Sequence, residues 1–160
     1  MARGKYDDAR LLFRLQYVLG PRFLEGFPEW KRVHAGPSLC LTAHPDLAVS
    51  TASAGDRSIV LIGYILDPYR PEDRDEDILR RLLRHLKEGG TRDTLIKMTE
   101  PLGGRWVLLV DHGGAIWLFN DPCGCRQVFY TRGTTGPLWC TSEPGLRAEL
   151  LHLLMDHEAR

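Results

Sequence analysis

Residues 102–130, LGGRWVLLVDHGGAIWLFNDPCGCRQVFY, constrain the fold more than any other part of the chain. Two apolar runs, 105–111 and 115–120, flank His112-Gly113-Gly114, and adjacent glycines suit the positive φ angles of a tight hairpin. Both runs are apolar at nearly every position, whereas a strand exposed on one face would alternate. With 127–131 as a third strand, the segment predicts an antiparallel meander covered on both faces.

Composition narrows the class of protein without naming a function. The chain has 160 residues, which predicts a single domain over 1–160, and its 21 acidic and 21 basic residues balance. No basic excess points to nucleic acid or to an anionic membrane. The sequence contains no membrane-spanning apolar run, and its first residues carry no signal-peptide hydrophobic segment. We therefore expect a cytoplasmic protein with reduced thiols at Cys40, Cys123, Cys125 and Cys140.

Further strands and helices are predicted on either side of the meander. An apolar stripe from Ile78 to Leu86 predicts a helix, with Asp73 or Asp75 as its N-cap and Gly89-Gly90 as its stop. A shorter helix is predicted over 92–99, and a final one follows Ser142 as N-cap. A helical turn is expected at 28–33. The remaining predicted strands are 11–19, a hairpin of 38–42 with 47–51, 59–66 interrupted by Gly63, and 137–141. This order predicts an α+β fold with mostly antiparallel sheets.

Several of these segments together resemble a known family. Leu102-Gly103-Gly104-Arg105-Trp106, the Asp121-Pro-Cys-Gly124-Cys-Arg126-Gln-Val-Phe-Tyr130 turn and Cys140-Thr-Ser-Glu143 look like the motif series of class II glutamine amidotransferase domains. Asparagine synthetase and its relatives carry such a domain at the N-terminus. Upstream, Gly63-Tyr-Ile-Leu-Asp67, followed by Asp75 and the predicted helix, resembles the family's strand-loop-helix. The resemblance implies the four-layer αββα sandwich of the N-terminal-nucleophile hydrolases. It also implies that Gly104, Arg105, Asp121, Gly124, Arg126 and Tyr130 are scaffold residues.

The resemblance also implies a chemistry that this sequence does not support. In the family an N-terminal Cys attacks the glutamine amide, and its own α-amino group serves as base. An Asn next to a Gly completes the oxyanion hole, a Glu follows that Gly, and an Arg and an Asp hold the substrate. Here the chain begins Met1-Ala2-Arg3, with no Cys, Ser or Thr before Ser38. Ile62-Gly63-Tyr64 stands where Asn-Gly-Glu is expected.

Little of the family's substrate site therefore remains. Ile62 offers no donor to an oxyanion, and loss of one such donor typically costs roughly 3 kcal/mol of barrier. Asp75 matches the Asp that binds the substrate amine, and no Arg matches the carboxylate ligand. We expect no catalytic residue and no glutaminase activity. The degenerate substrate pocket would comprise Ile62, Gly63, Tyr64 and Asp75, with Tyr64 filling the vacated space.

The remaining candidate sites have simpler explanations. A lone Cys123-x-Cys125 lacks the second pair that zinc sites use, and the six histidines have no metal-ligand spacing, so no metal or cofactor is expected. The loop 68–74 reads as solvated surface that could contact a partner. Without a pyrophosphate-binding loop the chain cannot activate a carboxylate with ATP by itself.

The leading hypothesis is a degenerate domain of an asparagine-synthetase-like, amide-forming protein. β-Lactam synthetases and lasso-peptide cyclases are relatives that have lost the glutaminase. The domain would pack on an ATP-dependent synthetase domain in the same or a partner chain, and could hold a peptide or protein substrate. One alternative is an amidohydrolase of the same fold that uses an internal Cys such as Cys40. Another is a stand-alone interaction module that forms a homodimer through an exposed sheet edge or through the Leu-rich final helix.

Overall fold

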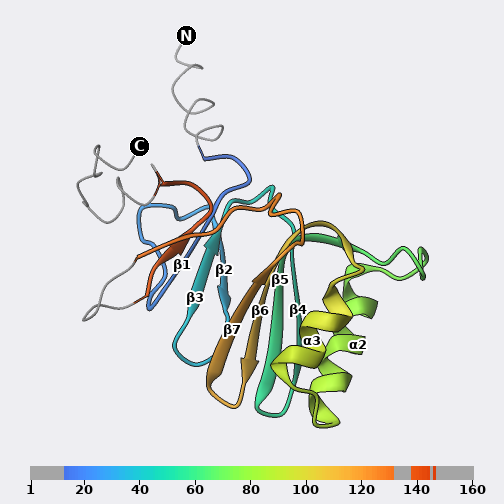
Figure 1. The fold of residues 1–160 in the computed structure, drawn as a ribbon. Helices are drawn as coiled ribbons and strands as arrows, with labels where there is room; N and C mark the ends of the chain where they lie inside the picture. Colours follow the sequence, from blue (N-terminus) through green and yellow to red (C-terminus); the bar gives the residue numbers. More distant parts are fainter. Residues whose placement is uncertain (1–12, 132–137, 145, 147–160) are drawn as a thin grey trace. The chain divides into compact units, whose positions relative to one another are not determined.

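A computed structural model describes residues 13–131, 138–144 and 146 of the chain (Figure 1). The architecture is α+β, with two antiparallel sheets and, in this part of the chain, the two helices α2 and α3. The chain divides into two compact units, each built around one sheet. The first unit draws on Met1–Val33, Cys40–Leu47 and Val128–Arg160, and the second comprises His34–Leu39 and Ala48–Gln127.

The second unit has a four-stranded sheet in the order β4-β5-β6-β7. Its strands are β4 (Val49–Ala54), β5 (Arg57–Leu66), β6 (Gly103–His112) and β7 (Ala115–Asn120). β5 and β6 pair without a break from Arg57↔His112 to Leu66↔Gly103. The predicted interruption at Gly63 is therefore wrong, because Gly63 stays in register opposite Trp106.

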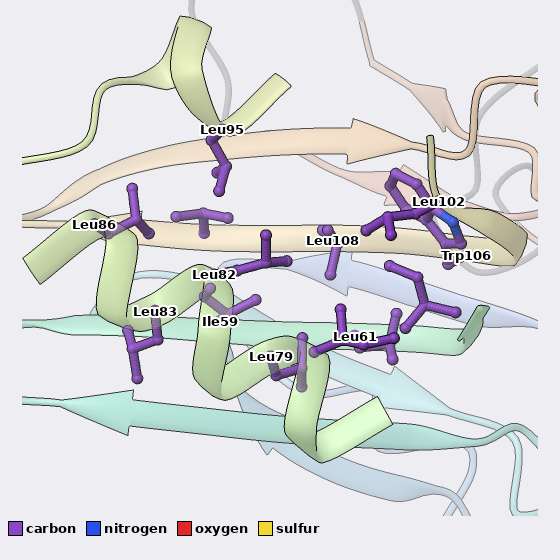
Figure 2. Packing of buried hydrophobic residues seen from close by; sticks show 13 residues of the cluster. Ile59, Leu61, Leu79, Leu82, Leu83, Leu86, Leu95, Leu102, Trp106 and Leu108 are labelled. Carbon is purple, nitrogen blue, oxygen red and sulfur yellow. The ribbon is translucent and has the colours of Figure 1, made fainter. Parts of the chain in front are cut away.

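Two helices cover one face of this sheet, as Figures 1 and 2 show. α2 (Asp75–Lys87) presents the predicted stripe, and α3 (Arg92–Thr99) has the predicted bounds. Alternate residues of β5 and β6 meet these helices, so one continuous core forms between the helices and the sheet. Its buried members are Ile59, Leu61, Ile65, Ile78, Leu79, Leu82, Leu83, Leu86, Leu95, Leu102, Trp106, Leu108 and Val110.

The start of α2 differs from the sequence prediction. Its N-cap is Arg74, and the reciprocal contact is made by Asp77, whose carboxylate accepts the backbone N–H of Arg74 at 3.1 Å. Asp73 and Asp75, the predicted caps, bind other groups. The helix begins where predicted because three acidic residues in the first turn, Asp75 among them, complement the positive end of the helix dipole.

The β6–β7 hairpin confirms the prediction made from Gly113-Gly114. Both glycines have positive φ, 62° and 91°, and His112 pairs with Ala115 across the turn. β6 is buried from Trp106 to Asp111, in keeping with its continuous apolar run. β7 is not: it is a sheet edge with no fully buried residue, and Leu118 is 37% exposed. The prediction that both faces of the meander are covered is therefore wrong for β7, because an edge strand leaves part of its surface exposed.

The first unit has a five-stranded sheet in the order β2-β3-β1-β9-β8. Its core includes Val18, Leu24 and Trp30. The predicted strand 11–19 is shorter in its described part, because Phe13 and Leu15 have positive φ and form a turn before β1. The expected helical turn at 28–33 forms only in part: residues 28 and 29 are in a turn closed by the Trp30 N–H and the Phe27 carbonyl, the buried Trp30 is its apolar anchor, and 31–33 belong to strand β2. The strands are β1 (Tyr17–Gly20), β2 (Lys31–His34), β3 (Cys40–Ala43), β8 (Phe129–Tyr130) and β9 (Cys140–Thr141).

Two predicted strand pairings are wrong. The hairpin of 38–42 with 47–51 does not form, because β3 pairs with β1 and β4 pairs with β5 in the other sheet. The third strand of the meander leaves its sheet as well, since β8 pairs with β9. In both places the sequence showed a strand but not its partner: β4 and β8 each pair with the strand that follows them, and β3 pairs back with β1.

The predicted final helix lies mostly outside the described residues. Pro144 and Leu146 are helical, and the Leu146 N–H donates to the Glu143 carboxylate at 2.6 Å, as to an N-cap. Ser142, the predicted cap, instead accepts the Tyr17 N–H at 2.8 Å through its hydroxyl oxygen. Ser142 therefore links the start of β1 to the residues that follow β9 through a hydrogen bond.

Candidate functional site

Two glycines allow β5 and β6 to approach closely at the position that resembles the family's glutamine site. Gly63 and Gly104 have φ angles of 102° and 110°, a region that disfavours any side chain. A Cβ on Gly63 would lie 2.1 Å from the carbonyl oxygen of Arg105. A Cβ on Gly104 would lie 2.4 Å from the carbonyl oxygen of Tyr64. Both positions therefore require glycine for steric reasons.

Asp121 organises the turn that follows β7. Its side chain is 2% exposed, and its two oxygens accept the backbone N–H groups of Cys125 at 2.8 Å and Arg126 at 2.9 Å. Burial raises the pKa of Asp121, but these backbone donors outweigh it and hold the pKa below its usual value. The carboxylate of Asp121 therefore holds its own turn through backbone N–H groups.

Arg126 joins this turn to the glycine pair. Its side chain is buried, and its Nε donates to the carbonyl oxygen of Arg105 at 3.4 Å. The same Nε would lie 2.9 Å from a Cβ on Gly63. Arg105 and Arg126 thus meet at Gly63, with Gly104 next to Arg105, whereas Asp121 and Gly124 belong to the turn that carries Arg126. Tyr130 belongs to β8 in the first unit and is 55% exposed.

The predicted degenerate pocket is filled differently than expected. Ile62 is fully buried, which agrees with a packing role. Tyr64 is 50% exposed, so the expectation that it fills a vacated pocket is wrong. The alternation of β5 explains this: Tyr64 and Leu66 share a face beyond the last residue that β4 pairs, and both remain open.

Asp75 binds the edge of β5. β4 pairs only as far as Ile62, and β5 continues for four more residues. Beyond that point Gly63 donates its N–H to the Ala48 carbonyl at 2.8 Å, and Ile65 donates its N–H to Asp75 Oδ1 at 3.0 Å. Asp75 stands at the position that resembles the family's ligand for the substrate amine. Here its carboxylate binds the Ile65 backbone N–H instead.

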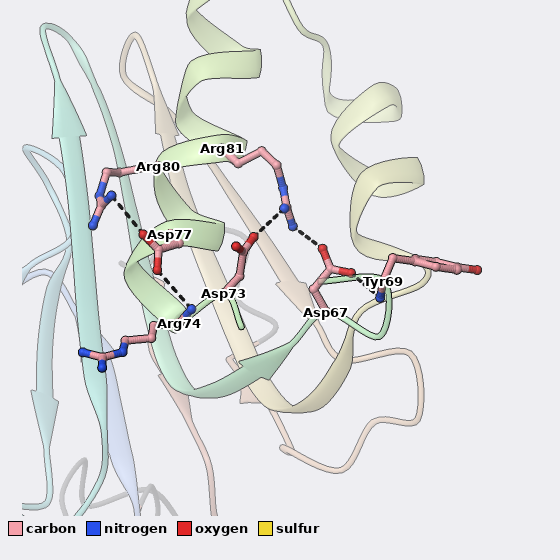
Figure 3. A network of polar contacts seen from close by, with 7 residues as sticks. All are labelled: Asp67, Tyr69, Asp73, Arg74, Asp77, Arg80 and Arg81. Atoms are coloured by element: carbon pink, nitrogen blue, oxygen red, sulfur yellow. Dashed lines mark hydrogen bonds and ion pairs between the residues drawn. The ribbon is translucent and has the colours of Figure 1, made fainter. Parts of the chain in front are cut away.

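The loop 67–74 is held by an ion-pair network that the sequence analysis missed (Figure 3). Arg81 of α2 contacts both Asp67 and Asp73, the latter at 2.7 Å. Asp67 also accepts the Tyr69 N–H at 2.9 Å. Burial raises the pKa of Asp67, while the Tyr69 N–H and the Arg81 guanidinium lower it, and the lowering prevails. The prediction of a solvated loop over 68–74 is therefore wrong at Asp73, whose side chain is 21% exposed and paired with Arg81.

This network presents one aromatic ring to solvent. Tyr69 is 81% exposed, and in Figure 3 its ring points away from α2 while its backbone is fixed by Asp67. No local pattern could have shown this, because Arg81 lies in the middle of a helix and its partners precede that helix.

The four cysteines differ in exposure. Cys40 is 8% exposed, and its Sγ lies 3.9 Å from the carbonyl oxygen of Pro21. Cys123 and Cys125 are exposed. Desolvation and the Asp121 carboxylate raise the pKa of the Cys125 thiol, which keeps it protonated and weakly nucleophilic. In the described ranges, no three His, Cys, Asp or Glu side chains are grouped so as to hold a metal ion.

Comparison with known proteins gives no family for this chain. No protein-family model matches the sequence, and no curated protein is significantly similar to it. Neither α2 nor α3, the helices in the described part of the chain, is long and apolar enough to cross a membrane.

Proposed function

We propose that this chain is a catalytically degenerate domain of the class II glutamine amidotransferase type, serving an asparagine-synthetase-like, ATP-dependent amide-forming protein. One observation carries the proposal: Arg105 and Arg126 of the motif series contact Gly63, and Asp121 holds the turn that carries Arg126, yet the polar groups there bind the chain itself. Asp121 binds its own turn, Arg126 binds Arg105, and Asp75 binds Ile65.

The loss of chemistry follows from the side chains at this place. Ile62 occupies the position of the oxyanion Asn and has no hydrogen to donate. Residues 2–37 contain no Cys, Ser or Thr, so this sequence has no such side chain ahead of β1 or β2. Cys40, the internal alternative, is 8% exposed within β3, and buried thiols are generally inert. These features support a domain that does not hydrolyse glutamine.

The finer fold is part of the proposal. The helix-facing residues of β5 and β6 alternate with a second apolar set, Val60, Ile62, Val107 and Leu109. A sheet that is apolar on both faces needs a second layer, and the chain carries a second sheet that could supply it. We infer an αββα sandwich, which is the architecture of the amidotransferase domains.

The remaining role would be to dock on the synthetase or its substrate. Without glutamine hydrolysis, the amine for amide formation must come from elsewhere, for example from an amine of a peptide or protein substrate. The loop 67–74 offers a contact surface, because Tyr69 is exposed while its backbone is fixed. A rigid exposed tyrosine gains contact area at little entropic cost.

The partner assignment is tested by affinity capture of the full chain from its source cell. We expect recovery of a protein with a pyrophosphate-binding synthetase domain, and ATP–pyrophosphate exchange by the captured complex. A Tyr69→Ala variant should capture less of it, while Glu72→Ala, an exposed change in the same loop, should capture as much. Capture without any such synthetase, or equal capture by Tyr69→Ala, would contradict the docking role.

A further inference from the structure

A cavity of about 340 Å³ lies at the hairpin end of the second unit, away from the Gly63 cluster. It is bordered by the β4–β5 turn, the β6–β7 turn and the loop 35–39, which is closed by a hydrogen bond from the Ala35 N–H to the Leu39 carbonyl at 2.8 Å. Its lining is almost wholly polar or glycine: Gly36, Pro37, Ser53, Gly55, Asp56, Arg57, Ser58, Asp111, Gly113 and Gly114.

Three of the lining side chains form a row across three strands. Ser53 pairs with Ser58 between β4 and β5, and Ser58 pairs with Asp111 between β5 and β6. Directly paired residues of an antiparallel sheet project from the same face, and neighbouring strands lie about 4.8 Å apart. The row therefore places two hydroxyls and a carboxylate side by side. It faces away from the helices, since the neighbouring Ile59 packs against them.

One carboxylate oxygen of Asp111 accepts a hydrogen bond, and the other does not. The carboxylate is 8% exposed, and its Oδ1 accepts the Gly114 N–H at 2.9 Å. Among the described residues, neither Asp111 Oδ2 nor the hydroxyls of Ser53 and Ser58 have a hydrogen-bond partner. Asp111 Oδ2 is not one of the fully buried polar atoms without a partner, so it is an acceptor that a ligand's donor can reach from solvent.

Gly36, in the loop 35–39, leaves space next to Asp111 Oδ2. Gly36 has a φ of 91°, and a Cβ there would lie 2.8 Å from Asp111 Oδ2 and 2.9 Å from Ile116 Cδ1. Any larger residue would press on the carboxylate, so Gly36 keeps the cavity open above it.

The charges favour a cationic ligand. Asp56, at the rim, is 77% exposed at its side chain, and its Oδ1 lies 3.9 Å from Arg57 Nε, so these two charges offset each other and Asp111 supplies the remaining negative charge. Arg57 is the cationic lining residue, but its Nη1 donates to the carbonyl oxygen of Leu86 at the end of α2. A metal ion is a poor fit, because a single buried carboxylate with two hydroxyls falls short of the oxygen ligands that Mg²⁺ or Ca²⁺ requires.

We propose that this cavity binds a small primary amine that also carries a hydroxyl group. The ammonium group has three donors, and it lies between Asp111 Oδ2 and the Ser58 hydroxyl. The hydroxyl end reaches Ser53, one strand further along the row. The cavity is thus an amino-alcohol site, independent of the proposed amidotransferase ancestry.

The proposal is tested by nuclear magnetic resonance titration of the full chain with 4-aminobutan-1-ol, with neutral butane-1,4-diol as the matched control. The amides of Gly36, Gly113 and Gly114 are the reporters. The amine should shift these amides saturably, and the diol should not. Equal shifts with both compounds, or no shift with the amine, would overturn the proposal.

Two variants test whether the amine binds at the row of Ser53, Ser58 and Asp111. Asp111→Asn keeps an oxygen for the Gly114 N–H but removes the charge, so half-saturation should need at least about ten times more amine, which corresponds to 1.4 kcal/mol. Ser58→Ala should weaken binding by a smaller factor. Unchanged half-saturation in a folded Asp111→Asn protein would contradict the assignment. If that variant does not fold, an unchanged Ser58→Ala titration would do so.

Discussion

Asp75 Oδ1 accepts the backbone N–H of Ile65 at 3.0 Å, at the point where β5 has run past the end of β4. The first turn of α2 thereby supplies the edge partner that the missing strand residues would have supplied. The relationship explains Asp75 without any substrate, although its position resembles that of a substrate ligand.

Asp75→Ala should lower the free energy of unfolding by about 1–2 kcal/mol, because the Ile65 N–H loses its acceptor and the helix loses a first-turn charge. Asp75→Asn keeps an oxygen acceptor and should lose less. Urea denaturation measures both. Equal stability of Asp75→Ala and the wild type would mean that the contact contributes nothing.

Gly63→Ala should destabilise the protein by about 3 kcal/mol or more, because the new methyl group meets the Arg105 carbonyl at 2.1 Å as well as an unfavourable φ. Gly89→Ala is the matched control: its φ is 92°, and nothing lies within 4 Å of the added Cβ. That change should cost about 1 kcal/mol. Thermal unfolding distinguishes the two, and similar losses would show that the close approach at Gly63 is unimportant.

Arg81→Ala should cost about 2–4 kcal/mol, because Asp67 is 8% exposed at its side chain and loses its paired charge. Arg80→Ala removes the exposed pair with Asp77, in which the side chains are 66% and 40% exposed, and should cost under about 1 kcal/mol. Denaturation curves of the two variants provide the comparison. Equal costs would argue that the loop network is no stronger than a surface ion pair.

Because of Asp121, the free energy of unfolding should decrease at acid pH. Its folded pKa is lowered by the backbone N–H donors of Cys125 and Arg126, so its contribution is present above the unfolded pKa, near 4. That contribution is lost as the pH falls through the lower folded pKa. The stability difference between the wild type and Asp121→Asn should therefore be constant from about pH 5 to 7 and shrink below about pH 4. A difference that does not change with pH would contradict the lowered pKa.

Local patterns predicted the elements that depend on neighbouring residues. The stripe of α2, the bounds of α3 and the Gly113-Gly114 hairpin follow from residues within a few positions of each other. The contact of Arg126 with Arg105 and Gly63 could not be predicted from local patterns, since Arg126 is far from both in the chain.

Strand partners and buried polar contacts could not be predicted in this way. β3 and β4 are adjacent in sequence yet pair in different sheets, and their hydrophobic patterns suit either arrangement. Arg81 looks like a solvated helix residue until Asp67 is placed beside it. The row of Ser53, Ser58 and Asp111 appears only once the register of three strands is known.

The central claim is that the Gly63 cluster retains an amidotransferase scaffold without its chemistry. The most direct measurement is the release of ammonia from glutamine by the purified chain, with an active amidotransferase assayed alongside. The account predicts a rate no higher than that of glutamine in buffer. Release above that rate, reduced by Asp75→Asn and by Gly63→Ala, would contradict it.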